Sequence, residues 1–251
     1  MSGEQAMQIA IYPDIETISR EAANYTMRVA REAIAKRGKF TVALSGGTTP
    51  GKLYALLVSE PYRSQIDWSA VHFFWSDERC VAPTDPQSNY YLAQEALLSK
   101  LSLRPDQIHR APADRPDRVQ ASADYEAEIR KVVGGEVPAF DLIQLGMGPE
   151  AHTASLFPHQ PALRERTRLI MPVSVPKPPP DRLTFTPPLL HAARHILFLA
   201  TGVDKAEALH EVLEGADNPE EYPTQGIVRQ AKGEVVWMVD TAIAQQIHHT
   251  R

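Results

Sequence analysis

Residues 140–158 read FDLIQLGMGPEAHTASLFP, and this stretch indicates both the fold class and the position of a functional site. The apolar run 140–145 is typical of a buried strand. Two glycines, a proline and His152 follow it, so the backbone turns sharply and presents a titratable ring. In an open α/β sheet, ligands bind in the crevice beyond the carboxyl ends of the strands. The stretch therefore predicts a site at the end of a buried strand.

Strand-like and helix-like segments alternate along the rest of the chain. Apolar runs predict further strands at 8–12, 40–44, 71–75, 169–175, 196–200 and 235–239. Helical spacing and stop signals predict helices at 14–36, 51–59, 89–99, 119–133, 205–213 and 241–247. Long loops are expected at 76–88 and at the proline-rich 177–180. This alternation implies an α/β fold, a three-layer, Rossmann-like and mostly parallel sheet with helices on both faces, built as a single domain over residues 1–251.

Composition and charge restrict the class of partner. The net charge of −5 provides no sequence-wide basic field for nucleic acid or an anionic membrane. No run approaches the ~18 apolar residues of a membrane span, and residues 1–11 lack the pattern of a signal peptide. Cys80 is the single cysteine, which excludes an intrachain disulfide and fits a reducing compartment. We therefore expect a cytoplasmic protein with a small-molecule ligand.

The first candidate site loop is Ser45-Gly46-Gly47-Thr48, between a predicted strand and a predicted helix. Its glycines allow backbone N–H groups to approach a ligand, its hydroxyls can donate, and a helix N-terminus favours an anion. It is not a Walker loop, because no Gly-Lys-Ser/Thr follows. An ordinary strand-to-helix turn would look the same, so this loop alone leaves both interpretations open.

The second candidate loop begins with Asp77, Glu78 and Arg79 directly after the predicted strand 71–75. A run of charges is usually a solvated loop, but long ordered loops in compact domains are often functional. Arg79 could stabilise a developing oxyanion or hold a phosphate, and Asp77 could orient a sugar hydroxyl or Arg79. Cys80 is not expected to act as a nucleophile, since nothing in the sequence lowers its pKa.

His152 is the third candidate, as a proton acceptor that works near neutral pH. Glu150 could bias its ring, although Glu150 could instead cap a short helix beginning at 153–156. Arg182 and Lys205 are isolated cations that would ordinarily be surface charges. His152 and His159 show no accompanying set of metal ligands, so no metal site is expected.

These stretches, in this order, resemble the family of 6-phosphogluconolactonases, which is grouped with the glucosamine-6-phosphate deaminases. The resemblance spans essentially the whole chain and is carried by residues 45–50, 76–81, 88–90, 146–158, 182–184, 202–206 and 237–240. The histidine motif is its most specific part. One departure is Glu150-Ala151, where the family usually has Asp-Gly. Glutamate keeps the charge but reaches one methylene further, and alanine replaces a residue with greater backbone freedom.

The resemblance implies hydrolysis of 6-phospho-D-glucono-1,5-lactone in the oxidative pentose phosphate pathway, by a monomer or homodimer. Ester hydrolysis of this kind needs neither metal nor cofactor, so no cofactor is expected. His152 would be the base, with Glu150 beside it, Arg79 would stabilise the oxyanion, and Asp77 would position Arg79 or the sugar. The implied substrate- and phosphate-binding residues are Ser45, Gly46, Gly47, Thr48, Arg182 and Lys205.

Two alternatives remain at this stage. One is a deaminase or isomerase acting on glucosamine 6-phosphate, against which stands the run Ser155-Leu156-Phe157-Pro158 where the deaminase has an Asn-Glu pair. The other is a sugar-phosphate-binding protein without catalysis, which only the Glu150-Ala151 departure favours.

Overall fold

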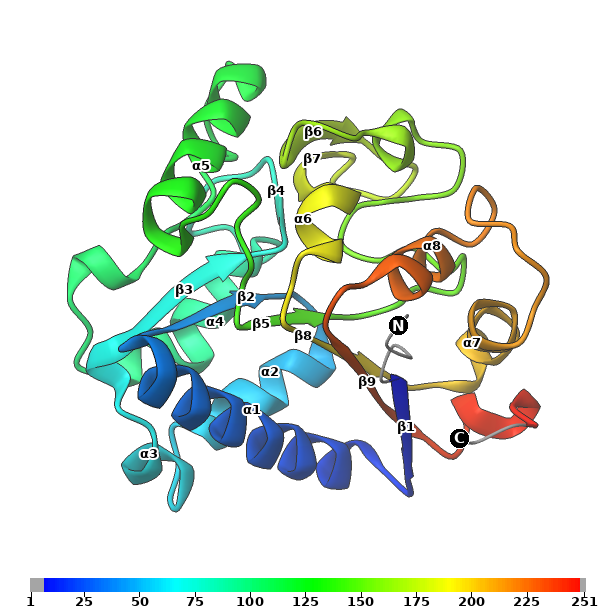
Figure 1. Cartoon of the computed structure of the whole chain (residues 1–251), viewed down its shortest axis with the longest axis horizontal. Helices are drawn as coiled ribbons and strands as arrows, with labels where there is room; N and C mark the ends of the chain where they lie inside the picture. Colours follow the sequence, from blue (N-terminus) through cyan, green and yellow to red (C-terminus); the bar gives the residue numbers. More distant parts are fainter. Residues whose placement is uncertain (1–6, 249–251) are drawn as a thin grey trace.

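The computed structural model describes residues 7–248 and is built around a six-stranded parallel sheet (Figure 1). The strand order is β1-β9-β8-β5-β2-β3, and the strands are β1 (Met7–Tyr12), β2 (Phe40–Leu44), β3 (Val71–Trp75), β5 (Leu142–Leu145), β8 (His195–Ala200) and β9 (Glu234–Asp240). After β3 at one edge, the chain returns to the other side of β2 and continues outward through β5, β8 and β9. The strand order therefore reverses between β2 and β5, which is where such sheets bind ligands.

A second sheet of three antiparallel strands lies beside the first (Figure 1). Its order is β4-β7-β6, with β4 (Asp77–Arg79), β7 (Asp181–Phe185) and β6 (Ile170–Ser174). The sequence predicted β6, but it predicted only a loop where β4 forms. Strand β4 has three polar residues and exists because it pairs with β7, Asp77 lying opposite Thr184 and Arg79 opposite Arg182.

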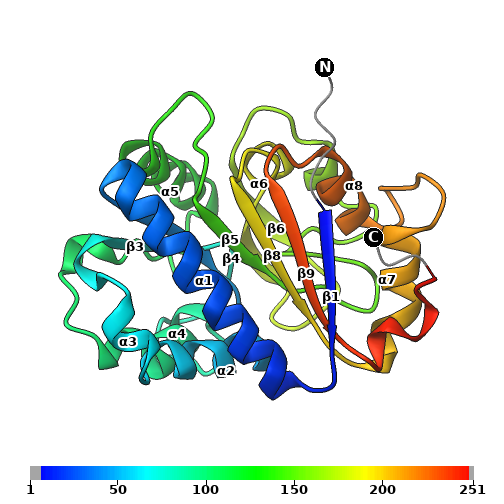
Figure 2. The same ribbon diagram turned by 60° about the horizontal axis from the view of Figure 1, so that its bottom comes forward.

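Helices cover both faces of the main sheet, as the alternation predicted. The helices α1 (Ile15–Arg37), α2 (Thr48–Leu57), α3 (Tyr62–Gln65) and α4 (Asn89–Ala96) supply apolar side chains to one core. The helices α5 (Arg118–Val133), α6 (Pro187–His191), α7 (Ala206–Leu213) and α8 (Pro223–Gln230) supply the other. Figure 2 shows α1 running across the strands on its face of the sheet.

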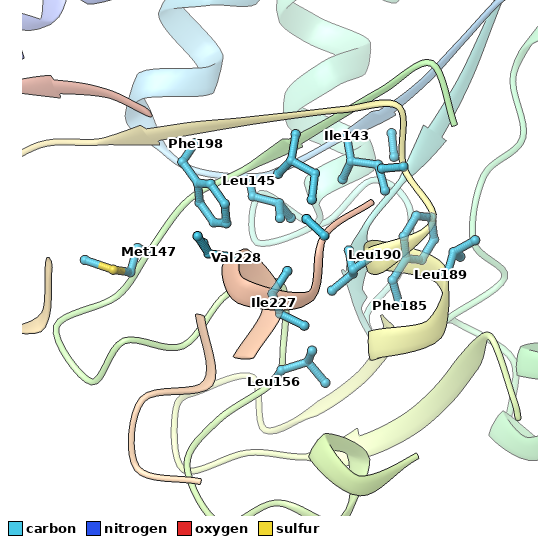
Figure 3. Close-up of a cluster of buried hydrophobic side chains, with 14 of the residues drawn as sticks. Ile143, Leu145, Met147, Leu156, Phe185, Leu189, Leu190, Phe198, Ile227 and Val228 are labelled. Atoms are coloured by element: carbon cyan, nitrogen blue, oxygen red, sulfur yellow. The ribbon is translucent and has the colours of Figure 1, made fainter. Parts of the chain in front are cut away.

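The two cores follow from the period-2 alternation of side chains along each strand. In β9, Val235 and Trp237 belong to one core, while Val236 and Met238 belong to the other. Figure 3 shows side chains of β5, β8, α6 and α8 gathered in the first of these cores. Because both faces are buried, the strands are nearly continuous apolar runs, which explains why they were recognisable in the sequence.

Helix α1 is capped at both ends. The Asp14 side chain accepts a hydrogen bond from Thr17 N (2.7 Å) at the first turn. Gly38 ends the helix at φ 72°, a left-handed conformation that glycine adopts without steric cost, and its N–H donates to Ile34 O.

Some expected boundaries were wrong. Helix α2 begins at Thr48, three residues before the predicted start at Gly51, because Gly47 adopts φ 108° and the helix forms directly after it. Thr153–Leu156 forms a turn and not a helix, so Glu150 caps nothing. The predicted helix at 241–247 is a 3-10 helix over Ile243–Gln246. Within residues 7–248, no helix is long and apolar enough to cross a membrane.

Asp141, directly before β5, joins three parts of the fold. Its side chain is 3% exposed, and Oδ1 lies 2.6 Å from Arg37 Nη2 and 3.5 Å from Arg194 Nε. Oδ2 accepts hydrogen bonds from Thr41 N (2.8 Å) and Thr41 Oγ1 (3.0 Å). The carboxylate therefore ties the start of β5 to β2, to the end of α1 and to the segment before β8.

We expect Asp141→Ala to lower the free energy of unfolding by about 3 kcal/mol, because it leaves buried donors of Thr41 without an acceptor and separates two cations from their anion. Urea unfolding followed by circular dichroism measures this. Asp217, which is 76% exposed and pairs with Arg229, provides the control. Asp217→Ala should change the free energy by less than about 1 kcal/mol. Equal losses in the two variants would contradict the role of Asp141.

Candidate active site

A pocket of about 180 Å³ opens where the strand order reverses. It is formed by the loops that follow β2 and β5, by β4 and β7 of the second sheet, and by the first residue of α4. Its lining residues are Ser45, Gly46, Asp77, Arg79, Asn89, Gly146, Met147, Gly148, His152, Ala154 and Arg182. The three stretches that the sequence singled out therefore meet in one cavity.

The loop after β2 approaches the pocket through its backbone. A Cβ on Gly46 would lie 1.9 Å from Asn89 Oδ1, so only glycine fits there. The backbone of Ser45 is fixed by the Tyr54 hydroxyl, which donates to Ser45 O (2.7 Å) and accepts from Ser45 N (3.0 Å). Ser45 Oγ is buried and has no hydrogen-bond partner among the described residues. The cavity wall therefore contains a hydroxyl whose hydrogen-bonding capacity the described residues do not satisfy.

His152 and Glu150 form a hydrogen-bonded pair, with Nδ1 of the ring 2.9 Å from Oε2 of the carboxylate. An ionised carboxylate only accepts, so the ring donates from Nδ1 and its Nε2 is left as the acceptor. The ring stacks on Phe157, with centroids 3.9 Å apart and an interplanar angle of 11°. A Cβ on Gly148 would lie 2.0 Å from His152 Cε1, so glycine is required for the ring to occupy this place.

Ala151 adopts φ 54°, the left-handed conformation that favours glycine. Its carbonyl accepts hydrogen bonds from Thr224 N (2.9 Å) and Thr224 Oγ1 (2.6 Å) at the first turn of α8. Glycine at this position in the related motif thus has a conformational explanation. In this chain, the two hydrogen bonds from α8 help to hold an alanine in the same conformation.

The pKa of His152 is lowered from its ordinary value, chiefly because burial disfavours the imidazolium, while the Glu150 carboxylate opposes this effect. For Glu150, burial acts to raise the pKa. The hydrogen bonds from Lys177 and His152 outweigh it, and the pKa of Glu150 lies below its usual value. Near neutral pH the pair is therefore a neutral imidazole beside a carboxylate, which is the state that a general base requires.

Arg182 and Asp77 form a buried polar group in the pocket wall. Asp77 Oδ2 accepts from Ser155 Oγ (2.7 Å) and lies 3.8 Å from Arg182 Nη1. Burial lowers the pKa of Arg182, and the Asp77 carboxylate opposes this. Asn89 Nδ2 donates to Asp77 O (2.9 Å). Asp77 thus links the second sheet to the histidine loop, which contains Ser155.

Arg79 faces Arg182 across the β4–β7 pair, which places two guanidinium groups in the same pocket. Arg79 Nη1 donates to Gln87 O (2.6 Å), and its Nε is buried without a hydrogen-bond partner in the described chain. Like charges on directly opposite residues repel. The arrangement therefore favours an anionic ligand between or beside the two groups.

Three sequence-predicted binding residues lie outside the pocket lining. Gly47 and Thr48 are exposed at the start of α2, beside the lining residue Gly46. Lys205 Nζ contacts Thr201 O (2.9 Å) and both carboxylate oxygens of Asp204 (3.0 Å each). Lys205 is thus paired with residues one and four positions before it in the chain and does not line the pocket.

Glu78 is a site residue to which the sequence analysis gave no role. Its buried carboxylate accepts four hydrogen bonds, from Arg79 N, Ser88 Oγ, Asn89 N and Tyr90 N, at 2.7–3.0 Å. Burial raises its pKa, and these hydrogen bonds act in the opposite direction. Glu78 therefore fastens β4 to the first turn of α4 and fixes the lining residues on both sides of it. Its only sequence signal was its place between Asp77 and Arg79.

The remaining candidates for a nucleophile or a metal site do not line the pocket. Burial raises the pKa of the Cys80 thiol to about 11, so the thiolate is scarce at neutral pH. Among the described residues, one cluster could hold a cation: His210, Glu214 and His248 offer ligand atoms within 4.8 Å of one another at the end of α7. None of these residues lines the pocket.

Comparison with known proteins identifies the class of protein. A family model described as glucosamine-6-phosphate isomerases/6-phosphogluconolactonase matches residues 13–237. The 6-phosphogluconolactonase of Synechocystis is 40% identical over 233 residues, which cover 92% of this chain and 93% of that protein. The 6-phosphogluconolactonase of Streptomyces coelicolor is 38% identical over 249 residues, covering 96% and 94%. The chain therefore belongs to the family of glucosamine-6-phosphate isomerases and 6-phosphogluconolactonases.

Solved structures have the same fold. The 6-phosphogluconolactonase from Trypanosoma cruzi is 28% identical and superposes with a TM-score of 0.85 over 99% of each chain. A monomeric glucosamine-6-phosphate deaminase, at 20% identity and a TM-score of 0.80 over 96% of this chain and all of that one, shares the fold alone. The fold is thus common to a 6-phosphogluconolactonase and a glucosamine-6-phosphate deaminase, so only the residues of the site can distinguish the two reactions.

We expect the pKa of the His152 imidazole to lie below the ordinary histidine value of 6.5, since burial disfavours the charged ring. The chemical shift of its Cε1 proton, followed by NMR as the pH is changed, measures this pKa, and His152→Ala assigns the resonance. A His152 pKa at or above 6.5 would contradict the burial of the ring described here.

Proposed function

We propose that this protein hydrolyses 6-phospho-D-glucono-1,5-lactone to 6-phospho-D-gluconate. The observation that carries the proposal is a neutral His152 oriented by Glu150, in a pocket that also holds two guanidinium groups. Ester hydrolysis requires a base, a stabiliser of the oxyanion and groups that position the substrate. Membership of the family supports the substrate, because the relatives that match most of this chain are named 6-phosphogluconolactonase.

In the proposed mechanism, Nε2 of His152 takes a proton from a water molecule as its oxygen attacks the lactone carbonyl carbon. The carbonyl π electrons move to oxygen, and Arg79 stabilises this oxyanion. When the tetrahedral intermediate collapses, the bond from carbon to the ring oxygen breaks, and His152 returns the proton to that oxygen. Glu150 accepts the Nδ1 hydrogen bond throughout and stabilises the transient imidazolium. Asp77 positions the sugar and the guanidinium groups.

We assign the phosphate to the end of the pocket formed by the loop after β2. Ser45, Gly46, Gly47 and Thr48 provide hydroxyl and backbone donors at the start of α2, where the helix dipole favours an anion. Arg182 and Lys205 supply positive charge. In this proposal the phosphate draws Lys205 away from Asp204, whose Oδ2 lies 3.0 Å from Lys205 Nζ.

The two rival functions predict different products. A glucosamine-6-phosphate deaminase would release ammonia from glucosamine 6-phosphate. Against it, Phe157 presents an apolar ring directly to the face of His152. A binding protein without catalysis would bind the phosphorylated sugar and leave the spontaneous hydrolysis rate unchanged. The intact hydrogen bond from His152 to Glu150 is evidence against that alternative.

We also propose that the enzyme acts in the oxidative pentose phosphate pathway of the cytoplasm, as a monomer or homodimer and without nucleic-acid or membrane partners. The single cysteine and the acidic net charge support this setting. Cell fractionation and sedimentation test the location and the oligomeric state.

His152→Ala should reduce kcat by about 10²–10⁴-fold and leave KM within a few fold, because a general base acts mainly in the transition state. The assay follows freshly prepared 6-phosphogluconolactone against its spontaneous hydrolysis. His159→Ala, an exposed histidine near the same loop, should retain wild-type turnover. Near-normal turnover by a folded His152→Ala protein would exclude His152 as the base. Failure of the folded wild type to accelerate hydrolysis would overturn the proposed function.

Arg182→Ala should raise KM more than it lowers kcat, because phosphate binding is largely shared by ground and transition states. It should also lower the melting temperature, since it removes the cation beside the buried Asp77 carboxylate. Arg164, a surface residue paired with Glu220, is the control, and its alanine variant should change neither value. An unchanged KM in Arg182→Ala would remove Arg182 from the phosphate site.

A further inference from the structure

The proline-rich segment between β6 and β7, residues 176–180, contacts the hydrogen-bonded pair of His152 and Glu150 through Lys177. We call this segment the strap. Lys177 Nζ lies 2.7 Å from Glu150 Oε1, while Glu150 Oε2 lies 2.9 Å from His152 Nδ1. Each carboxylate oxygen therefore has its own partner, a lysine on one side and the histidine on the other. The carboxylate cannot rotate without losing both contacts.

The strap itself is held at several points. Val175 N donates to Pro180 O (2.8 Å), which closes the turn. Arg182 donates from Nε to Pro179 O (3.1 Å) and from Nη2 to Lys177 O (3.4 Å). The three consecutive prolines at 178–180 restrict φ and so reduce the number of conformations available to the backbone. The backbone that carries Lys177 is thus anchored, although its side chain is 41% exposed.

We propose that Lys177 is a positioning residue for the reaction, which holds Glu150 so that the carboxylate fixes His152 in its tautomer and orientation. The inference rests on the proposed function and extends it to a residue that does not line the pocket. Glutamate has one more rotatable bond than aspartate. A glutamate beside the histidine therefore benefits from a second anchor on its other oxygen.

Lys177 also affects the charge state of His152. The charged groups that act on His152 are Glu150 and Asp77, which raise its pKa, and Lys177, which lowers it. Arg79 and Arg182 line the same pocket. Removing the lysine charge should therefore raise the pKa of His152, because it removes a cation near the ring and leaves Glu150 to pair with the histidine alone.

The test compares Lys177→Met, Lys177→Arg and a matched control, Lys52→Met. Lys52 pairs with Glu16 on the surface and is 42% exposed, close to the 41% of Lys177. We expect Lys177→Met to lower kcat by about 10–100-fold, since a small displacement of a reacting group is enough for such a loss. KM should stay within about twofold. Lys177→Arg should recover most of the activity, and Lys52→Met should match the wild type.

The pH profile separates positioning from general destabilisation. In kcat/KM, the acidic limb of Lys177→Met should move to higher pH than in the wild type, whereas that of Lys177→Arg should stay in place. Glu150→Gln should move the limb in the opposite direction, because it removes the anion that raises the pKa of His152. In the Glu150→Gln background, Lys177→Met should have little further effect on kcat, because the two residues act through one contact.

NMR titration of His152 in the same variants requires no turnover. It therefore distinguishes failure of this proposal from failure of the proposed function. If the wild type does not accelerate lactone hydrolysis, the proposed function fails, and a raised His152 pKa in Lys177→Met would still support the Lys177–Glu150–His152 contact. If Lys177→Met retains wild-type kcat and the same His152 titration, or if Lys177→Arg is as impaired as Lys177→Met, the positioning role is overturned.

Discussion

The buried guanidinium of Arg182 holds together the parts of the site. It lies 3.8 Å from Asp77 in the second sheet and 3.4 Å from the Ser155 hydroxyl in the histidine loop, and it donates to two backbone carbonyls of the strap. Burying such a cation is costly unless it is paired and hydrogen-bonded. The surrounding loops are therefore constrained to meet at this charge, and the pocket takes its shape from that constraint.

The sequence was sufficient to predict the strands of the main sheet and the contact between His152 and Glu150. Strands buried on both faces are continuous apolar runs, so β2 and β3 could be predicted to the residue. The Gly-Met-Gly-Pro-Glu-Ala-His stretch indicated His152 because a sharp turn after a strand is a local feature. The left-handed backbone at Ala151 was likewise suggested by the residue type that the related motif uses.

The structural features that could not be predicted from the sequence depend on contacts between segments that are distant along the chain. Strand β4 has three polar residues and no local strand signal, and it forms by pairing with β7 about a hundred residues later. Helix α8 contains Gly226 in its interior, which disfavours helix prediction, yet it is stabilised by the packing of Ile227 and Val228 in the core. The Lys177–Glu150 contact has the same origin, because it arises only when the second sheet packs beside the histidine loop.

The pairing of β1 with β9 has a consequence for how the chain folds during synthesis. Met7 lies opposite Val235 and Tyr12 opposite Asp240, and within residues 7–248 β1 pairs with no strand other than β9. Strand β1 therefore cannot join the sheet until β9, more than two hundred residues later in the chain, has been synthesised. Contacts of such long sequence separation slow folding. We expect the nascent chain to build its sheet from the central strands outward, with β1 docking only after β9 has formed.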